Sequence, residues 1–262
     1  MVIYFFPKKS MGQNFLMNDN IAESEAMHGI GRHVIEIGPG FGMLTKKLCK
    51  YAASVIAVEK DPYLFERLKR TIKSRKVRFI KADFFDVADN ELELGKNPIV
   101  IANVPYNISG KVIEWLSLKG VDALLCLQKE FVDRMVAKPG GRDYSKLSVI
   151  TSLSFSATRL GDVKKGNFRP MPKVDSSLIY LKPKNMHIDP EAIKMLDLLM
   201  QHKKKTVRKA IIDSRYYLKK DKNKIVAMAD ALKYKEERVF NLAPEVLLSI
   251  SEEIYAKQKQ MS

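Results

Sequence analysis

The stretch Val34-Ile-Glu-Ile-Gly-Pro-Gly-Phe-Gly42 decides the fold of this chain. It begins as an apolar β-strand, turns on three glycines and continues into an amphipathic helix. Glycines at such a turn permit positive φ angles and let a ligand approach the backbone, and the helix that follows presents free N–H groups. The stretch therefore predicts a strand–turn–helix unit that binds a ligand beside Gly38 and Gly40, although a tight turn without a ligand is the alternative for such a segment alone.

The spacing of the glycines separates two classes of cofactor. A dinucleotide-binding turn follows G-x-G-x-x-G, which would require a glycine at position 43. Position 43 is Met, and the third glycine is Gly42. The pattern E-x-G-x-G-x-G, which begins at Glu36, resembles instead the S-adenosylmethionine turn of class I methyltransferases.

Outward from this turn, short β-branched runs alternate with amphipathic stretches. Such alternation predicts a largely parallel sheet covered by helices, here an α/β fold of the class I (Rossmann-like) methyltransferase type with seven strands. We expect strands at 34–37, 54–59, 77–82, 98–102, 122–128, 155–163 and 174–181, and helices at 42–51, 62–74, 109–119, 129–137 and 144–154. The last two strands are joined without a crossover helix, so they should pair as an antiparallel hairpin, and one strand at the end should be antiparallel to the rest.

After Lys182-Pro183-Lys184 the pattern becomes helical throughout. Asp189-Pro190-Glu191 is typical of a helix start, with an Asp N-cap, a proline at the first helical position and an acid at the positive end of the dipole. Helical periodicity continues in 192–200, 206–214, 224–232 and 244–256. We therefore expect a methyltransferase domain at 1–183 and a small all-helical, RNA-binding domain at 184–262.

Charge indicates the partner. The chain has 46 Lys and Arg against 30 Asp and Glu, a net charge of +16, which attracts polyanions, although a basic surface kept for solubility is the alternative. The segment from Lys203 to Lys224 carries ten basic and two acidic residues, which gives it +8, half of the total. This concentration favours nucleic acid, and the residues expected to contact RNA are Lys8, Lys9, Lys203, Lys204, Lys205, Arg208 and Lys209.

Other classes of protein are disfavoured. Cys49 and Cys126 are the only cysteines, so neither a disulfide framework nor a metal site is expected. The apolar start, Met1–Phe6, is shorter than a secretory signal, and its basic residues follow it instead of preceding it. No apolar run approaches the ~18 residues of a membrane span. We expect a soluble, cytoplasmic protein, with a monomer as the default.

Three acids stand at the ends of successive predicted strands. Glu36 belongs to the glycine turn, Glu59 is placed to accept both ribose hydroxyls, and Asp83 is placed to accept from an adenine amino group. A single acid at a strand end is usually a helix cap or a solvated charge. Three in series favour a cofactor site, because ligands of parallel sheets bind at the carboxyl ends of the strands. Phe84, next to Asp83, is included in this predicted site.

The tetrapeptide Asn103-Val104-Pro105-Tyr106 follows the fourth predicted strand. It resembles the N/D-P-P-Y signature of amino-group methyltransferases and, more closely, the N-[LIV]-P-Y form of RNA adenine methylases. The N6 amine of adenine is a poor nucleophile, since its lone pair is delocalised into the ring. Acceptors at the amine, the Asn103 side-chain oxygen and, by resemblance, the Val104 carbonyl, would aim that lone pair at the methyl group. Pro105 would fix the backbone and Tyr106 would stack on the base, although such a tetrapeptide can also be a plain turn.

Phe168 is a candidate for a second aromatic contact with the base. It lies in the loop of residues 167–176, which two prolines stiffen. Taking a base out of its stack costs a few kcal/mol, and stacking on an aromatic side chain returns ~1–3 kcal/mol. A Tyr106/Phe168 sandwich would offset that cost; a hydrophobic plug between loop and sheet is the alternative for Phe168.

Together these residues resemble the rRNA adenine dimethyltransferase family, whose bacterial member is the methylase lost in kasugamycin resistance. The segment Lys8-Lys-Ser-Met-Gly-Gln-Asn-Phe-Leu16 resembles the family's opening K-x-x-G-Q-[NH]-F-L, which implies cofactor contacts from Gln13, Asn14 and Leu16. The segment Gln201–Ala210 resembles the basic helix of archaeal and eukaryotic members. The other motifs follow in family order, so the resemblance covers nearly the whole chain.

The resemblance implies the transfer of two methyl groups to each of two adjacent adenosines in a hairpin loop near the 3′ end of small-subunit rRNA. It also implies action on a partly assembled small subunit, with the helical domain gripping RNA. Three alternatives are less favoured. A large-subunit methylase of the macrolide-resistance type is disfavoured by the basic segment Gln201–Ala210. A noncatalytic RNA-binding assembly or transcription factor is disfavoured by the intact site residues, and an NAD-linked oxidoreductase is disfavoured by Met43 and by the net charge of +16.

Overall fold

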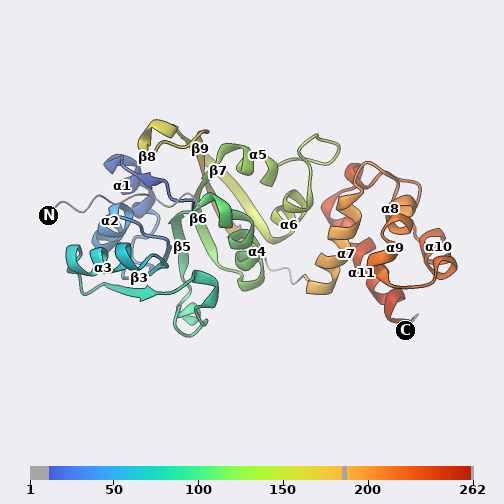
Figure 1. Ribbon diagram of the computed structural model, residues 1–262, viewed down its shortest axis with the longest axis horizontal. Coiled ribbons are helices and arrows are strands. Elements are labelled where there is room, and N and C mark those ends of the chain that lie inside the picture. Colours follow the sequence, from blue (N-terminus) through green and yellow to red (C-terminus); the bar gives the residue numbers. More distant parts are fainter. Residues whose placement is uncertain (1–11, 185–187, 261–262) are drawn as a thin grey trace. The chain divides into compact units, whose positions relative to one another are not determined.

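The computed structural model describes residues 12–184 and 188–260, which divide into two units (Figure 1). The first unit comprises the chain up to Val132 together with Ala157–Pro183. The second comprises Asp133–Ser156 together with the chain from Lys184 onward. Helix α5 (Lys129–Met135) crosses the first division.

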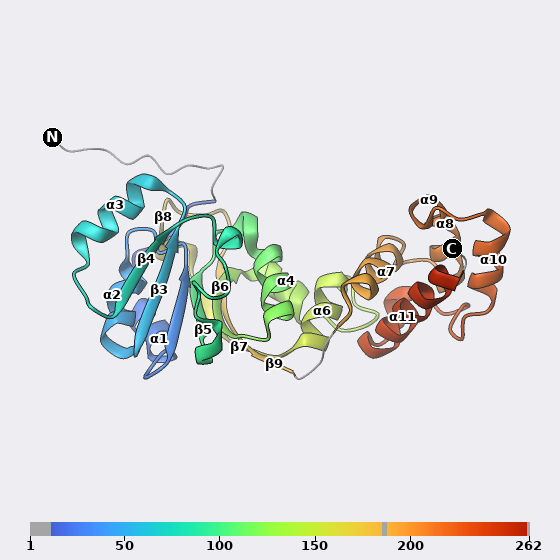
Figure 2. The ribbon, with the colours of Figure 1, turned by 90° about the horizontal axis from the view of Figure 1, so that it is seen from below.

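The first unit is built on one seven-stranded sheet, with the order β4-β3-β2-β5-β6-β9-β7 (Figure 2). Its strands are β2 (His33–Ile37), β3 (Ser54–Glu59), β4 (Val77–Lys81), β5 (Ile99–Asn103), β6 (Asp122–Gln128), β7 (Phe155–Val163) and β9 (Ser176–Pro183). Strand β2 is parallel to both β3 and β5, and β9 is antiparallel to β6. The chain thus runs outward from β2 in both directions, which makes the gap between β2 and β5 a topological switch point, where such sheets bind ligands.

The central strands owe their position to their apolar sequences. All five residues of β2 are buried, and β5 is buried apart from its last residue, Asn103. Strands covered on both faces read as continuous apolar runs, whereas the edge strand β4 keeps the exposed Arg78 and Lys81. The helices of this unit are α1 (Asp19–Met27), α2 (Met43–Tyr51), α3 (Pro62–Thr71) and α4 (Ser109–Lys119), with short 3₁₀ turns η2 (Phe84–Asp86), η3 (Leu94–Lys96), η4 (Tyr106–Ile108) and η5 (Lys165–Asn167).

The predicted fold class is confirmed: the sheet has seven strands and is mostly parallel. The antiparallel strand, β9, lies between β6 and β7, so β7 and not β9 ends the sheet. A second, two-stranded sheet was not predicted. In it β1 (Phe15–Leu16) pairs with β8 (Phe168–Arg169), and Leu16 lies opposite Phe168. Strands of two residues are too short to give a periodic sequence signal.

The second unit is helical. It contains α6 (Lys146–Ser154), α7 (Pro190–Gln201), α8 (Val207–Asp213), α9 (Arg215–Leu218), α10 (Lys222–Asp230), η6 (Val239–Asn241) and α11 (Pro244–Gln260). The start of α7 follows the predicted signal, because the Asp189 carboxylate accepts from the Glu191 backbone N–H at 2.8 Å and Pro190 opens the helix. No helix within residues 12–184 and 188–260 is long and apolar enough to cross a membrane.

The predicted domain boundary needs a correction at residues 133–156. Those residues were placed with the methyltransferase domain, but they belong to the helical unit. Val149, Ile150 and Leu153 of α6 are buried in the same hydrophobic cluster as side chains of α7 and α11. In addition, the Tyr144 hydroxyl donates to the Leu242 carbonyl at 3.0 Å. Periodicity shows that α6 has an apolar face, but it does not show which core that face joins.

Candidate active site

The main cavity of the first unit opens at the carboxyl ends of β2, β3 and β5, around the switch point. Its volume is about 180 Å³. A smaller cavity of about 30 Å³ shares Asn14, Phe15, Gly38 and Asn103 with it. The residues predicted to bind the cofactor all line one or both: Gln13, Asn14, Leu16, Glu36, Gly38, Gly40, Glu59, Asp83, Phe84 and Asn103.

The glycine turn packs against Phe15, and residues 12–15 line the cavity. Gly38, Gly40 and Gly42 have φ angles of 66°, 59° and 79°, which favour glycine. A Cβ on Gly40 would lie 2.6 Å from the Phe15 ring, so the close approach of that ring also requires glycine. Phe15 packs against Phe41 at 4.5 Å between ring centroids. This contact places Gln13 and Asn14 at the cavity.

Glu59 is held by the backbone at the end of β3. One carboxylate oxygen accepts from the Gly40 N–H at 3.1 Å and the other accepts from the Asp61 N–H at 2.8 Å. Burial raises the pKa of Glu59, and these two hydrogen bonds oppose that shift. Each carboxylate oxygen can accept a further bond, so the group is fixed in place and still able to accept from hydroxyls.

Asp83 has a neighbour that the sequence did not indicate. The Lys60 ammonium lies 2.7 Å from one Asp83 oxygen, and the Phe85 N–H donates to the other at 3.2 Å. The lysine contact, which is the larger effect, lowers the pKa of Asp83 and keeps it ionised. The buried Phe84 ring packs edge-on against Trp115 at 4.9 Å, which gives this end of the cavity an apolar wall.

Two buried acids meet near Asn103. Glu36 on β2 and Glu25 on α1 are each 2% exposed, and burial raises the pKa of each carboxyl to about 8. The Asn103 side-chain N–H donates to Glu25 Oε2 at 2.9 Å. Among the described residues, Glu25 Oε1, Glu36 Oε2 and Asn103 Oδ1 have no hydrogen-bond partner. Glu36 and Asn103 line the smaller cavity. Buried oxygens without partners are costly in a protein, so these two fit a ligand that brings donors or positive charge.

Sequence reasoning missed Glu25, although a signal exists. Ala22, Glu25 and Ala26 recur at the three- and four-residue spacing of one helix face, and all three are buried. An acid on the apolar face of a predicted helix is an unusual feature that could have been noticed.

The tetrapeptide Asn103–Tyr106 is anchored on both sides. The Val104 N–H donates to the Cys126 carbonyl at 3.2 Å, so the main chain beyond β5 still follows β6. Pro105 lines the main cavity beside Asn103. The Tyr106 hydroxyl shares a hydrogen bond of 2.8 Å with Ser176 Oγ at the start of β9. Tyr106 is half-buried, so it retains some surface for a base.

Phe168 differs from its prediction. The sequence suggested an exposed ring opposite Tyr106, but the Phe168 side chain is 3% exposed and packs in a cluster with Leu16, Ala22 and Cys126. It therefore acts here as the hydrophobic plug that was the alternative. A stacking contact with a base would require the ring to leave this cluster.

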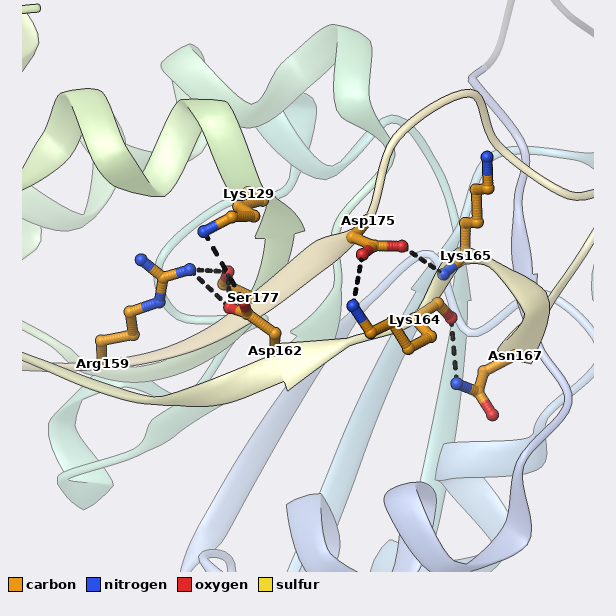
Figure 3. Close-up of polar contacts among 8 residues, drawn as sticks. All are labelled: Lys129, Arg159, Asp162, Lys164, Lys165, Asn167, Asp175 and Ser177. Carbon is orange, nitrogen blue, oxygen red and sulfur yellow. Dashed lines mark hydrogen bonds and ion pairs between the residues drawn. The ribbon is translucent and has the colours of Figure 1, made fainter.

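The loop that carries Phe168 is fixed by a polar network (Figure 3). Asp175 accepts from the Lys164 ammonium at 3.0 Å and from the Lys165 backbone N–H at 2.9 Å, so it joins the two ends of the loop. The Asn167 amide then donates to the Lys164 carbonyl at 2.9 Å. Further along the hairpin, Ser177, Arg159, Asp162 and Lys129 form a second group of contacts. The conformation of the loop is therefore held by hydrogen bonds and an ion pair from specific side chains, in addition to its turn-forming residues.

The residues predicted to bind RNA fall into three groups. Lys8 and Lys9 lie outside the described residues. Lys203 donates to the carbonyls of Arg142 and Tyr144, Lys205 pairs with Asp213 and Arg208 pairs with Asp230. Lys204 and Lys209 are exposed and form no ion pair with any residue in the described part of the chain. The basic segment is thus partly neutralised by Asp213, which lies within it, and by Asp230, 22 residues after Arg208.

This sheet order, with the glycine turn and the cavity at the switch point, defines a class I S-adenosylmethionine-dependent methyltransferase. The model of the ribosomal RNA adenine dimethylase family matches residues 5–254. The chain belongs to that family, and it is an S-adenosylmethionine-dependent rRNA adenine dimethyltransferase.

Individual relatives agree. A probable ribosomal RNA small subunit methyltransferase A of Thermococcus gammatolerans is 35% identical, over 96% of this chain and 90% of the relative. The protein so described in Methanopyrus kandleri is 37% identical, over 91% and 89%. A crystal structure of a dimethyladenosine transferase from Plasmodium falciparum superposes with a TM-score of 0.75 at 25% identity, covering 93% of this chain and 98% of that one. The 23S rRNA methyltransferase ErmE shares the fold, with a TM-score of 0.57 at 22% identity over 92% and 99%.

Proposed function

We propose that the enzyme dimethylates the N6 amines of two adjacent adenosines in a hairpin loop near the 3′ end of small-subunit rRNA. It would do so as a cytoplasmic monomer, on rRNA or a partly assembled small subunit, with a role in small-subunit biogenesis. Relatives described as small subunit methyltransferases support the choice of subunit. The observation that carries the choice of atom is Asn103 Oδ1, a buried acceptor without a partner among the described residues, beside the cofactor cavity.

The chemistry follows from that acceptor. When bound, S-adenosylmethionine supplies a methyl group that its sulfonium charge already activates. Asn103 Oδ1 would accept from the target amine, together with the Val104 carbonyl, and direct the nitrogen lone pair. A strong base is unnecessary, because the proton can leave after transfer. The rate would therefore come mainly from positioning and fixed dipoles.

The remaining cavity residues would hold the cofactor. Glu59 would accept the ribose hydroxyls, since its position is already set by Gly40 and Asp61. Asp83 and Phe84 would hold the adenine, by hydrogen bond and by apolar contact. The rest of the predicted set, Gln13, Asn14, Leu16, Glu36, Gly38 and Gly40, would enclose the other end of the cofactor.

For RNA, the proposed surface is the exposed part of the helical unit. Lys204 and Lys209 keep their place in it, and Lys219, Lys222 and Lys224 lie exposed further along the same segment. Two exposed aromatic side chains, Tyr216 and Tyr217, are 75% and 66% exposed on α9. Lysines that contact phosphates together with aromatic rings that stack on bases are a common arrangement in RNA-binding proteins. Lys203, Lys205 and Arg208 would contribute less, because each already binds a protein group.

The test is transfer of tritiated methyl groups from S-adenosylmethionine to small subunits that lack the modification, with products mapped by mass spectrometry. Dimethyladenosine at two neighbouring positions near the 3′ end is the expected result. Incorporation only into large-subunit RNA would contradict the proposed substrate. No incorporation into any RNA, despite cofactor binding, would contradict catalysis and favour a noncatalytic assembly factor.

A further inference from the structure

The buried acid on α1 has a distinct environment. The other acids of that helix point outward: Asp19 and Glu23 both pair with Lys47 of α2, at 2.5 and 2.8 Å. Glu25 instead lies between alanines on the inward face, and within the described residues its carboxyl accepts one hydrogen bond, from Asn103. A carboxyl group placed in this apolar position costs folding free energy, so a role at the neighbouring site would explain it.

The contact selects one orientation of the Asn103 amide. An amide has a donor end and an acceptor end, and an ionised carboxylate can only accept. When it is ionised, Glu25 can therefore bind only the Nδ2 end, as it does here at 2.9 Å, and this leaves Oδ1 as the end without a partner among the described residues. A flipped amide would present N–H groups to the target amine, and two donors would then face each other.

We propose that Glu25 is a positioning residue, which holds the Asn103 amide so that Oδ1 faces the N6 amine of the target adenosine. The inference rests on the proposed role of Asn103 as the acceptor of that amine. Glu25 itself contacts neither reacting atom. It acts through the side chain that does, and it belongs to a helix outside the motifs that identify the site.

Ionisation of Glu25 should control this orientation. A protonated Glu25 can donate, so it also tolerates the flipped amide, whereas the carboxylate does not. Burial raises the pKa of Glu25 to about 8. The titratable groups near Glu25 are Glu36 on β2 and Cys126 on β6. The charge of Glu25 contributes to raising the pKa of both groups. Lys47 of α2 is engaged by the outward acids. Turnover should therefore rise with pH as Glu25 ionises, through the region around pH 8.

The experiment compares Glu25→Leu and Glu25→Gln with Glu23→Gln, a matched acid-to-amide change on the outward side of the same helix. Turnover is measured from pH 6.5 to 9, with cofactor affinity measured by calorimetry and folding by circular dichroism. Glu25→Leu should lower kcat by about 10- to 100-fold while the Kd for S-adenosylmethionine changes less than about threefold, since the amide loses its orientation but the cofactor contacts remain. Glu25→Gln still offers an acceptor, so it should retain more activity but lose the rise with pH. Glu23→Gln should keep both the normal kcat and the rise of turnover with pH.

The Asn103→Ala background separates the proposed role of Glu25 from the proposed role of Asn103. If Glu25 acts through Asn103, adding Glu25→Gln to Asn103→Ala should cause no further loss of kcat. A folded Glu25→Leu enzyme with near-normal kcat, or a Glu25→Gln enzyme that keeps the rise with pH, would overturn the role of Glu25 alone. Near-normal turnover of Asn103→Ala itself would overturn the role of Asn103 and, with it, this proposal.

Discussion

Polar side chains are buried in the cavity of the first unit and exposed in the basic segment of the helical unit. In the cavity, the Glu36 side chain and the Oδ1 atom of Asn103 are buried, and each residue keeps an oxygen that no described residue satisfies. In the basic segment, charged groups are exposed, and several are satisfied by neighbours such as Asp213 and Asp230. Buried polar groups interact strongly and are hard to replace, whereas exposed charges are screened and act as a sum. Catalysis and RNA affinity should therefore respond differently to substitution.

The largest effect is expected at Asn103. Asn103→Ala should reduce methyl transfer by about 100- to 1,000-fold, because it removes a fixed acceptor from the reacting amine. Cofactor affinity should stay nearly unchanged, since Glu59 and the glycine turn remain. Single-turnover transfer and calorimetry measure the two quantities separately. A parallel loss of both would mean that Asn103 chiefly holds the cofactor.

The next effect is expected at Glu59. Glu59→Ala should weaken S-adenosylmethionine binding by about 10- to 100-fold, as expected for hydrogen bonds to a charged group. At saturating cofactor, kcat should recover most of its value, which distinguishes Glu59 from Asn103. Equilibrium dialysis and a cofactor titration of the rate would measure this. An unchanged Kd would exclude the proposed ribose contact.

Substitutions on the basic segment should have smaller and graded effects. Replacing Lys204 and Lys209 with Gln should weaken RNA binding and reduce the salt slope by about one for each lost phosphate contact. The matched control replaces Lys205 and Arg208, which already pair with acids, and should change the slope less. Filter binding between 50 and 200 mM salt, about the range over which such slopes are measured, gives both values. Equal slopes for the two variants would mean that the ion pairs open on RNA.

A separate effect concerns stability and pH. The folded-state pKa values of Glu25 and Glu36 are raised from 4.5 to about 8, so the folded protein binds more protons than the unfolded chain between these values. Its free energy of unfolding should therefore decrease as the pH rises from about 4.5 to about 8, and then level off. Thermal unfolding without cofactor at pH 5.5 and 8.5 checks the sign. The Glu25→Gln variant should show a shallower decrease, and a Tm that rises with pH would contradict the burial argument.

The same contrast explains what the sequence could and could not predict. The glycine turn and the strand-end acids were predictable because each lies next to a regular element, and all of them line the cavities. The role of Glu25 could not be predicted from the sequence, since its partner Asn103 is 78 residues away. Nor could the burial of Phe168, which depends on a two-residue pairing with Leu16. Local pattern locates elements and motifs, whereas partners across the fold are set by packing.

The ion pairs of the basic segment also show that partners distant in the sequence cannot be predicted from local pattern. Lysines and arginines in a run indicate a polyanion partner, but the run does not show which of them already have a protein partner. Arg208 pairs with Asp230, 22 residues further on, and Lys203 binds main-chain carbonyls about 60 positions earlier. A sequence can therefore give the net charge of a surface more reliably than its contact residues.

The allocation of α6 has a practical consequence for protein engineering. A chain cut after Pro183 would keep residues 133–156 but lose the helices that bury Val149, Ile150 and Leu153. It would expose an apolar face to water and tend to aggregate. Grafting the helical unit onto another methyltransferase would likewise require two insertions, of 133–156 and of the segment from Lys184 onward. The helical unit is transferable only as a pair of segments.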